Sequence, residues 1–275
     1  MSMRIAIQGI KGCFHQIAAN NYFGYSVDVK ECLTFNDVVF SVKNQDNCSL
    51  GIMAIENTIA GSLLQNYRLL QKNNLNIIGE TYLRIQQNLI APKGTQLSEI
   101  KEINSHPMAI YQCEDYLNSM HNVKVVETED TALSVKNLQN ISNVKRAAIG
   151  SSLSAEIYKM NILEKSIETN KKNYTRFLII SNYANSNLEE SNKASIYLEL
   201  DNKKGSLANV LQIISTNNIN LSKLQSYPII GTSWQYYFHL DLEYEKYSDF
   251  KNSIEKIKPY ISGIKILGNY SRGGA

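Results

Sequence analysis

The chain has 275 residues, of which 43% are hydrophobic and 19% are charged, and its formal net charge at pH 7 is +3. A chain of this length can bury enough core for two or three compact units, and the composition is that of a globular rather than a disordered protein. Such a small net charge excludes a broadly basic nucleic-acid-binding surface, so any preference for anions must be local.

Neither a membrane segment nor a metal centre is indicated. No apolar run reaches the roughly 18 residues of a membrane span, and the N-terminus enters a strand pattern at once, so we expect a cytoplasmic protein with no membrane partner. Cys13, Cys32, Cys48 and Cys113 form no C-x-x-C pair and have no histidine cluster nearby. We therefore predict reduced thiols, no metal and no cofactor.

The N-terminal part of the chain alternates strand and helix patterns. A strand at 4–8 leads through Gly9-Ile10-Lys11-Gly12 into a helix that begins at Phe14, and the backbone N–H groups of such a loop can hold a phosphate or a carboxylate. The glycine spacing fits neither the Rossmann nor the P-loop fingerprint, so a nucleotide is not favoured. Further strands are predicted at 27–32, 50–55 and 75–79, with helices at 35–42 and 63–70.

Polar residues follow the strand at 50–55 as Glu56, Asn57 and Thr58. Open α/β sheets bind ligands at the carboxyl ends of their strands, and the Asn57 amide can both donate and accept hydrogen bonds. Capping of the helix that follows explains Glu56 and Asn57 equally well, so this stretch alone leaves both interpretations open.

A second α/β unit is predicted from about residue 81 to 169. Its strands are expected at 100–105, 123–127 and 146–149, and its helices at 107–120, 130–138 and 151–160. Pro107 suits the first turn of a helix, which places Ser105 at a strand-to-helix corner and Gln112 farther along the helix. The chain crosses between the units near 80–82 and 165–175, so we predict two lobes with a ligand cleft between them.

A hydroxyl and a guanidinium stand side by side at Thr175-Arg176, directly before the apolar run 177–180. The guanidinium can take a carboxylate through two parallel hydrogen bonds, and the hydroxyl can donate to a neighbouring oxygen. An isolated Thr-Arg pair is more often the exposed start of a strand, so an anion site here depends on the other polar groups.

The composition changes after residue 191. Strands are predicted at 194–200, 219–227, 234–242 and 263–269, and helices after Gly205-Ser206 and at 247–258. The order β-α-β-β-α-β is that of a ferredoxin-like module. Residues 271–275 carry no packing signal, and we expect them to fray.

Several motifs occur together and in one order. They are Gly9-Ile10-Lys11-Gly12-Cys13-Phe14-His15, Ala54-Ile55-Glu56-Asn57-Thr58 with Gly61-Ser62, Ser105-His106-Pro107 with Gln112-Cys113, Asp130-Thr131-Ala132 and Thr175-Arg176-Phe177. Through these motifs the chain, from Met3 to Asn269, resembles prephenate dehydratase, which converts prephenate to phenylpyruvate, with its C-terminal ACT regulatory domain.

The resemblance implies an α/β fold in which a two-lobed, periplasmic-binding-protein-like catalytic clamshell is followed by a ferredoxin-like ACT domain. The expected catalytic domain is 1–183, with lobe one at about 1–80 and 170–183 and lobe two at about 81–169. The remaining boundaries are a linker at 184–193, the ACT domain at 194–270 and a tail at 271–275.

The resemblance also implies roles for individual residues. Expected catalytic residues are Thr175, Asn57, Ser105, Gln112 and Glu56, and expected substrate-binding residues are Arg176, Phe177 and Gly12. A phenylalanine effector site is expected at Gly205, Ser206, Leu207, Asn220, Leu221, Gln225, Ser226 and Pro228. The implied partners are prephenate, phenylalanine and further copies of the chain in a homodimer or homotetramer, with no nucleic acid.

This chain departs from the family pattern at several positions. Cys13 and His15 stand where the family usually has hydroxyl residues, and Ala54 replaces a proline. The Gly-Ala-Leu motif of the ACT domain reads Gly205-Ser206-Leu207, and Glu-Ser-Arg-Pro reads Gln225-Ser226-Tyr227-Pro228, which removes both charges.

Two alternative functions remain. An arogenate dehydratase would use the same motifs on the amino-acid counterpart of prephenate. A non-catalytic, ACT-linked amino-acid sensor would share the architecture, but the intact pair Thr175-Arg176 together with Asn57 and Gln112 argues against it, since a sensor has no use for elimination chemistry.

Overall fold

The structure is a computed structural model that describes residues 4–24, 27–44, 48–140, 145–201, 203–229, 231 and 235–274. The chain divides into two compact units, which we call unit 1 (residues 1–66 and 81–177) and unit 2 (residues 67–80 and 178–274). Unit 2 therefore includes 67–80, which the sequence assigned to lobe one. The predicted domain boundaries stay a prediction.

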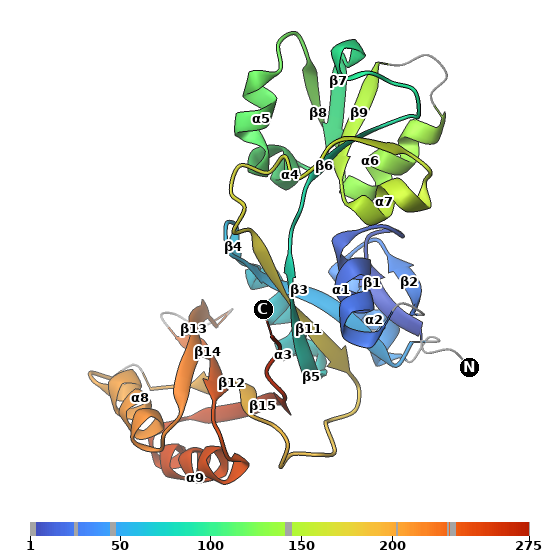
Figure 1. The fold of residues 1–275 in the computed structure, drawn as a ribbon. Helices are drawn as coiled ribbons and strands as arrows, with labels where there is room; N and C mark the ends of the chain where they lie inside the picture. Colours follow the sequence, from blue (N-terminus) through green and yellow to red (C-terminus); the bar gives the residue numbers. More distant parts are fainter. Residues whose placement is uncertain are drawn as a thin grey trace. The chain divides into compact units, whose positions relative to one another are not determined.

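The first sheet has six strands in the order β2-β1-β3-β11-β5, with β4 paired to β3 (Figure 1). Strand β1 pairs in parallel with both β2 and β3. The middle of β3 is an unbroken apolar run in which Ile52, Met53 and Ile55 are fully buried. Such a run is expected of a parallel strand that is covered on both faces. The strands are β1 (Arg4–Gln8), β2 (Asp28–Cys32), β3 (Leu50–Asn57), β4 (Gly61–Ser62), β5 (Asn76–Arg84) and β11 (Tyr174–Ser181), and the helices are α1 (Phe14–Phe23), α2 (Phe35–Lys43) and α3 (Leu64–Asn73).

The second sheet is mixed and has the order β10-β6-β9-β7-β8. Strand β7 is parallel to β8 and β9, whereas β6 is antiparallel to β9 and β10. The strands are β6 (Asn88–Ala91), β7 (Glu102–Ser105), β8 (Lys124–Glu127), β9 (Arg146–Gly150) and β10 (Asn161–Glu164). The helices are η1 (Leu97–Glu99), α4 (Pro107–Gln112), α5 (Glu114–Ser119), α6 (Thr131–Asn137), η2 (Leu138–Asn140) and α7 (Ser152–Ile157).

Two predicted helices differ from the structure. The helix predicted at 107–120 is broken at Cys113 because the backbone carbonyl of Gln112 accepts the N–H of Thr169 at 2.8 Å instead of an N–H of its own helix. The helix predicted at 151–160 ends at Ile157: Lys159 adopts φ +58°, and the N–H of Met160 bonds back to the carbonyl of Ala155 at 2.8 Å. This closure is typical of a helix C-terminus. The short strand β10 that follows was not predicted.

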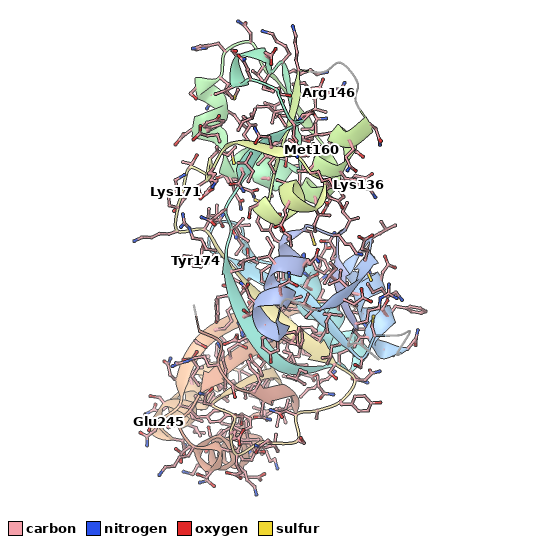
Figure 2. All side chains as sticks on the ribbon, turned by 45° about the vertical axis from the view of Figure 1, so that its right-hand side comes forward. Lys136, Arg146, Met160, Lys171, Tyr174 and Glu245 are labelled. Atoms are coloured by element: carbon pink, nitrogen blue, oxygen red, sulfur yellow. The ribbon has the colours of Figure 1, made fainter. Side chains whose placement is uncertain are left out.

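The two segments that cross between the first and second sheets are hydrogen-bonded to each other. The N–H of Ile85 donates to the carbonyl of Asn173, and the N–H of Ile167 donates to the carbonyl of Gln87, both at 2.8 Å. Lys171 and Tyr174 are labelled on the returning segment in Figure 2. The return crossing predicted near 165–175 is therefore paired with residues 85–87 within unit 1, whereas the crossing predicted near 80–82 comes a few residues later because 80–82 lie inside β5.

The third sheet lies in unit 2 and is antiparallel, with the order β13-β14-β12-β15. Its elements are β12 (Lys193–Glu199), α8 (Ser206–Thr216), β13 (Asn220–Pro228), β14 (Tyr236–Glu243), α9 (Tyr247–Ile257), η3 (Lys258–Tyr260) and β15 (Gly263–Tyr270), which gives the predicted order β-α-β-β-α-β. On β12, alternate residues Ala194, Ile196 and Leu198 enter the apolar core beneath α8 and α9. The turn and strand start predicted at 231–234 lie largely outside the described residues.

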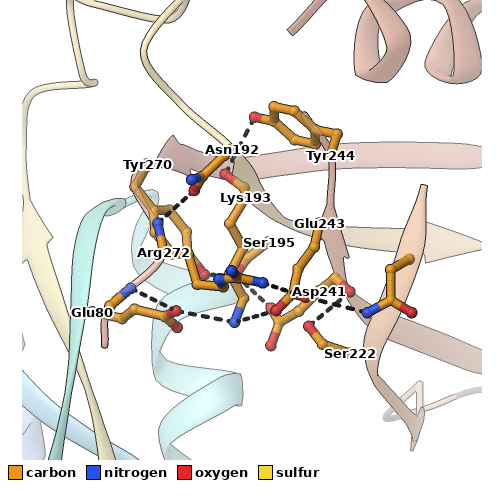
Figure 3. Close-up of polar contacts among 12 residues, drawn as sticks. Glu80, Asn192, Lys193, Ser195, Ser222, Asp241, Glu243, Tyr244, Tyr270 and Arg272 are labelled. Carbon is orange, nitrogen blue, oxygen red and sulfur yellow. Dashed lines mark hydrogen bonds and ion pairs between the residues drawn. The ribbon is translucent and has the colours of Figure 1, made fainter. Parts of the chain in front are cut away.

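The other set of alternate residues on β12 is polar and also buried. The ammonium of Lys193, 2% exposed, lies 3.0 Å from Oε1 of Glu80 and 3.3 Å from Oε1 of Glu243 (Figure 3). Ser195 donates from Oγ to Oδ1 of Asp241 at 2.5 Å. Buried charges are tolerated only when they are paired in this way. We call Lys193, Glu80 and Glu243 the buried ionic cluster.

The prediction that residues 271–275 fray is wrong for 271–273. The N–H of Arg272 donates to Oδ1 of Asn192 at 2.6 Å, and the Arg272 guanidinium pairs with Glu243 at 3.3 Å. The N–H of Gly273 donates to Oε1 of Glu80 at 3.2 Å, and a Cβ at this glycine would lie 2.6 Å from the Glu80 carbonyl oxygen. The sequence offered no apolar signal here because the tail binds through polar groups. Ala275 lies outside the described residues.

We expect Lys193→Met to lower the free energy of unfolding by roughly 3–5 kcal/mol, because Glu80 would stay buried without its cation. The double variant Lys193→Met/Glu80→Gln removes both charges and should recover most of that loss. Denaturant unfolding followed by circular dichroism measures the difference. Lys258→Met, which breaks the exposed pair with Glu255, is the control and should cost less than about 1 kcal/mol. A fully stable Lys193→Met would contradict the assignment.

Candidate active site

Unit 1 contains a cavity of about 450 Å³ whose walls come from elements of both the first and second sheets. From the side of the first sheet, the lining is Gln8, Cys13, Phe14, His15, Leu33, Thr34, Phe35, Ala54, Asn57, Ala60, Leu63, Thr175 and Phe177. The crossing and the second sheet's side contribute Ile85, Gln87, His106, Met108, Ala109, Gln112, Glu129, Asp130 and Thr131. Four of the predicted site residues therefore meet here: Asn57, Gln112, Thr175 and Phe177.

Asn57 is 7% exposed, and its side-chain amide is saturated with hydrogen bonds. Its Oδ1 accepts the backbone N–H groups of Ile59 and Ala60, both at 2.9 Å. Backbone N–H groups can only donate, so this contact fixes which end of the amide is oxygen. The amide nitrogen therefore donates, and its acceptors are Oδ1 of Asn173 at 2.7 Å, Oγ1 of Thr175 at 2.9 Å and the carbonyl of Tyr174 at 3.2 Å.

The direction of the hydrogen bond from Asn57 to Thr175 determines whether the Thr175 hydroxyl can donate to a ligand. Because Oγ1 accepts from Asn57, the single hydroxyl proton of Thr175 is left to donate elsewhere. Thr175 lines the cavity and is 7% exposed, so a ligand in the cavity is within its reach. The pair therefore presents a neutral hydrogen-bond donor to the cavity.

Gln112 is oriented by a glutamine that the sequence did not single out. Its side-chain amide is hydrogen-bonded to the amide of Gln87, with Gln87 Nε2 at 3.1 Å from Gln112 Oε1. Gln87 is 2% exposed and lines the cavity, and its backbone N–H is held by Oε2 of Glu168 at 2.9 Å. The polar pair Gln86-Gln87, directly after an apolar strand, was the signal that could have identified it.

Four predicted site residues do not line the cavity. Thr175 and Phe177 line it while Arg176 between them does not, as the alternation of side chains along a strand requires. Ser105 is fully buried and donates to the Ile149 carbonyl at 2.8 Å. Glu56 and Gly12 are also absent from the lining.

Gly12 packs closely against the start of α7. Its carbonyl accepts from Oγ of Ser151 at 2.5 Å, and a Cβ at Gly12 would lie 2.7 Å from the Cα of Ser154. Its φ of +91° also disfavours any other residue. The loop therefore needs glycine here for packing, and the substrate roles of Gly12, Glu56, Ser105 and Arg176 stay predictions.

Cys13 and His15 line the cavity at the start of α1. Burial raises the pKa of the Cys13 thiol to about 12, and its Sγ donates to the Gln8 carbonyl at 3.4 Å, so it is no thiolate nucleophile. Burial lowers the pKa of His15 to about 4, which makes the imidazole neutral at neutral pH. The four cysteines are free thiols, and all four are buried.

The described lining of the cavity has two histidines, His15 and His106, as its only basic side chains. Among its described lining residues the charged ones are Glu129 and Asp130, and none is a lysine or arginine. Burial raises the pKa of Asp130, whose Oδ1 accepts the Leu133 N–H at 2.7 Å to cap α6. Donors to an anionic ligand in this lining therefore come from amides, hydroxyls and the histidines His15 and His106. Within the described residues, no group of three or more His, Cys, Asp or Glu side chains is placed to hold a metal ion, and none of the helices could span a bilayer.

A mostly apolar cavity with a few oriented hydrogen-bond donors is typical of an enzyme that acts on a small molecule. The prephenate dehydratase family model matches residues 5–185, and the chain belongs to this family of lyases. Prephenate dehydratase of Methanocaldococcus jannaschii is 34% identical over 264 residues, which cover 94% of this chain and 95% of that protein.

Two solved structures share the fold over nearly the whole chain. One, described as a novel type of quorum-quenching acylase, has 24% identity and a TM-score of 0.89, with 98% of both chains covered. The other is prephenate dehydratase of Arthrobacter aurescens in complex with L-Phe, with 24% identity, a TM-score of 0.87, and 98% of this chain and 90% of that chain covered. At this identity, both likenesses concern the fold alone.

We expect Asn57→Asp to lower the turnover of prephenate by about 100-fold or more and to lower the unfolding temperature, because its carboxylate would face the oxygens of Asn173 and Tyr174. An aspartate keeps the bonds from Ile59 and Ala60 but has no N–H for Thr175, so the hydroxyl must donate to it and turn its proton from the cavity. Steady-state kinetics and thermal unfolding measure the two effects. A variant that turns over like the wild type would exclude this orienting role.

Proposed function

We propose that this chain catalyses the decarboxylating dehydration of prephenate to phenylpyruvate, a step in phenylalanine biosynthesis. The observation that carries the proposal is the 2.9 Å bond from Asn57 to Thr175, which presents a hydroxyl donor to the cavity of a chain that belongs to this enzyme family. The remainder of the lining supplies shape, apolar contact and further neutral donors.

The reaction needs little acid-base chemistry from the protein. The bond between the ring and its carboxylate breaks, its electron pair forms a ring double bond, and the ring hydroxyl leaves as hydroxide while the ring becomes aromatic. The Thr175 hydroxyl donates to the departing oxygen as negative charge develops on it, and solvent protonates the released hydroxide. A neutral hydroxyl is in the right form without a shifted pKa, and a donor held in place in advance stabilises the transition state.

The Gln112 amide provides a second donor.

We propose that the parts around the first and second sheets act as the two lobes of a periplasmic-binding-protein-like clamshell. The support is that elements of both sheets line the cavity and that the two crossing segments are hydrogen-bonded to each other. Closure of such lobes would exclude water from the substrate and fix its orientation.

The expected role of Arg176 is to anchor a substrate carboxylate. Since it is buried next to Thr175 without lining the cavity, it would reach the ligand only after a side-chain or lobe movement. Ser105, Glu56 and Gly12 are proposed to support the site through its backbone and packing.

Arogenate is a second candidate substrate. It differs from prephenate by an ammonium in place of the keto oxygen, and the observation that favours it is the presence of Glu129 and Asp130 in the lining. The ratio of kcat/KM for the two substrates, measured on the same protein sample, decides between them.

We expect Thr175→Ala to lower kcat by about 100-fold or more with a much smaller effect on KM, because its contact is strongest in the transition state. Thr175→Ser keeps the hydroxyl and should retain appreciable activity. The assay follows phenylpyruvate formation from prephenate. Equal turnover by Thr175→Ala and the wild type would remove Thr175 from the mechanism.

We also propose that the module around the third sheet is an ACT domain that binds phenylalanine and regulates the enzyme. The support is its β-α-β-β-α-β order and the L-Phe complex of the Arthrobacter aurescens protein. The proposed site is Gly205, Ser206, Leu207, Asn220, Leu221, Gln225, Ser226 and Pro228. Because β13 is an edge strand, it could pair with a second copy in a homodimer or homotetramer.

Phenylalanine should bind without formal charges in the altered motif, because backbone groups near Gly205 and the Asn220 amide can serve a zwitterion. We expect Asn220→Ala to weaken phenylalanine binding by about 10-fold, as measured by calorimetry. Asn252→Ala, on the exposed face of α9, is the matched control and should bind as the wild type does. If the intact protein releases no heat with phenylalanine and is not inhibited by it, the module is not an effector domain.

A further inference from the structure

His15 occupies a fixed position in the cavity. It is the second residue of α1, and its ring meets two aromatic rings edge-on, with centroid distances of 5.4 Å to Phe35 and 5.1 Å to Phe177. Edge-to-face contacts on two sides restrict rotation of the imidazole. The ring is therefore held in one orientation in the cavity wall before any ligand arrives.

A hydrogen bond from the backbone of Ala54 determines the tautomer of His15. The backbone N–H of Ala54 approaches Nε2 of His15 at 3.4 Å, and since a backbone N–H can only donate, Nε2 must accept. The single proton of the neutral imidazole then resides on Nδ1. His15 thus contributes an N–H donor to the lining, although no positive charge.

Such a donor would help the cavity to bind the carboxylates of its proposed substrate. A dianionic substrate requires donors for two carboxylates, and the described lining has no lysine or arginine to provide them. The positive end of the α1 dipole also favours an anion here, and the N-cap residue Cys13 makes no side-chain cap hydrogen bond.

We propose that His15 binds the pyruvyl carboxylate of the substrate through its Nδ1–H. This rests on the proposed dehydratase function and deepens it by naming which group is bound. The ring carboxylate is the wrong partner, because it loses its charge as carbon dioxide departs and a strong bond to it would favour the ground state. The pyruvyl carboxylate keeps its charge throughout. The contact is particular to this chain, since the family usually has a hydroxyl residue here.

Three substitutions at His15 distinguish the loss of its hydrogen-bond donor from the loss of its ring packing. His15→Phe keeps a ring against Phe35 and Phe177 but removes both nitrogens. His15→Asn places an amide N–H near the position of Nδ1, whereas His15→Gln places its amide near Nε2. Because the carboxylate is bound equally in the ground and transition states, the loss should appear in KM rather than in kcat.

We expect His15→Phe to raise KM for prephenate by about 10-fold or more with kcat changed less than about 3-fold, and His15→Asn to restore most of the affinity. His15→Gln should resemble His15→Phe. An unchanged KM in His15→Phe would overturn the proposal, and so would rescue by glutamine instead of asparagine.

A second measurement needs neither turnover nor a variant. In the wild-type protein labelled with 15N at histidine, the imidazole resonances should identify the Nδ1–H tautomer, and saturation with phenylpyruvate should shift the Nδ1 resonance. An Nε2–H tautomer, or no shift at saturation, would overturn the proposal. Failure of the proposed function is seen separately, as no phenylpyruvate formed from prephenate by the wild-type protein.

Discussion

The saturated amide of Asn57 is the contact on which the active site depends. It joins the end of β3 and the turn after it to the start of β11, and its orientation is fixed by two backbone donors. Because the oxygen end is fixed, the nitrogen end must donate to Thr175, and the Thr175 proton must serve the cavity. The Asn57 side chain thereby holds the local backbone in place and makes the Thr175 hydroxyl a hydrogen-bond donor towards the cavity.

Charge is distributed in an unexpected way for an enzyme whose substrate is a dianion. Arg176 is buried away from the lining, and Lys193 is held in the buried ionic cluster of unit 2. The cavity instead combines neutral donors, the uncapped start of α1 and an imidazole that burial keeps uncharged. Neutral donors suit this reaction, because a cation held tightly against the departing carboxylate would oppose its loss.

Much of the fold follows from patterns that the sequence displays openly, such as the apolar runs of β3 and β11 and the alternation on β12. The errors arise where a distant segment competes for a backbone group: Thr169 breaks the helix predicted at 107–120, and polar partners order the tail through Gly273. In the site, motif residues Asn57, Gln112 and Thr175 do meet. Sequence could not foresee that Gln87 would orient Gln112, since the two are brought together only by the crossing.

The buried ionic cluster also includes the carboxylate to which Asn220 of the proposed effector site donates a hydrogen bond. Although burial acts against it, the hydrogen bond from Asn220 and the cation of Lys193 lower the pKa of Glu243, which is thus held as a carboxylate. Glu243 shares Lys193 with Glu80, which belongs to β5. An effector that draws the Asn220 amide away from Glu243 leaves this carboxylate more dependent on Lys193. The ammonium would then be shared less equally with Glu80, its other carboxylate partner.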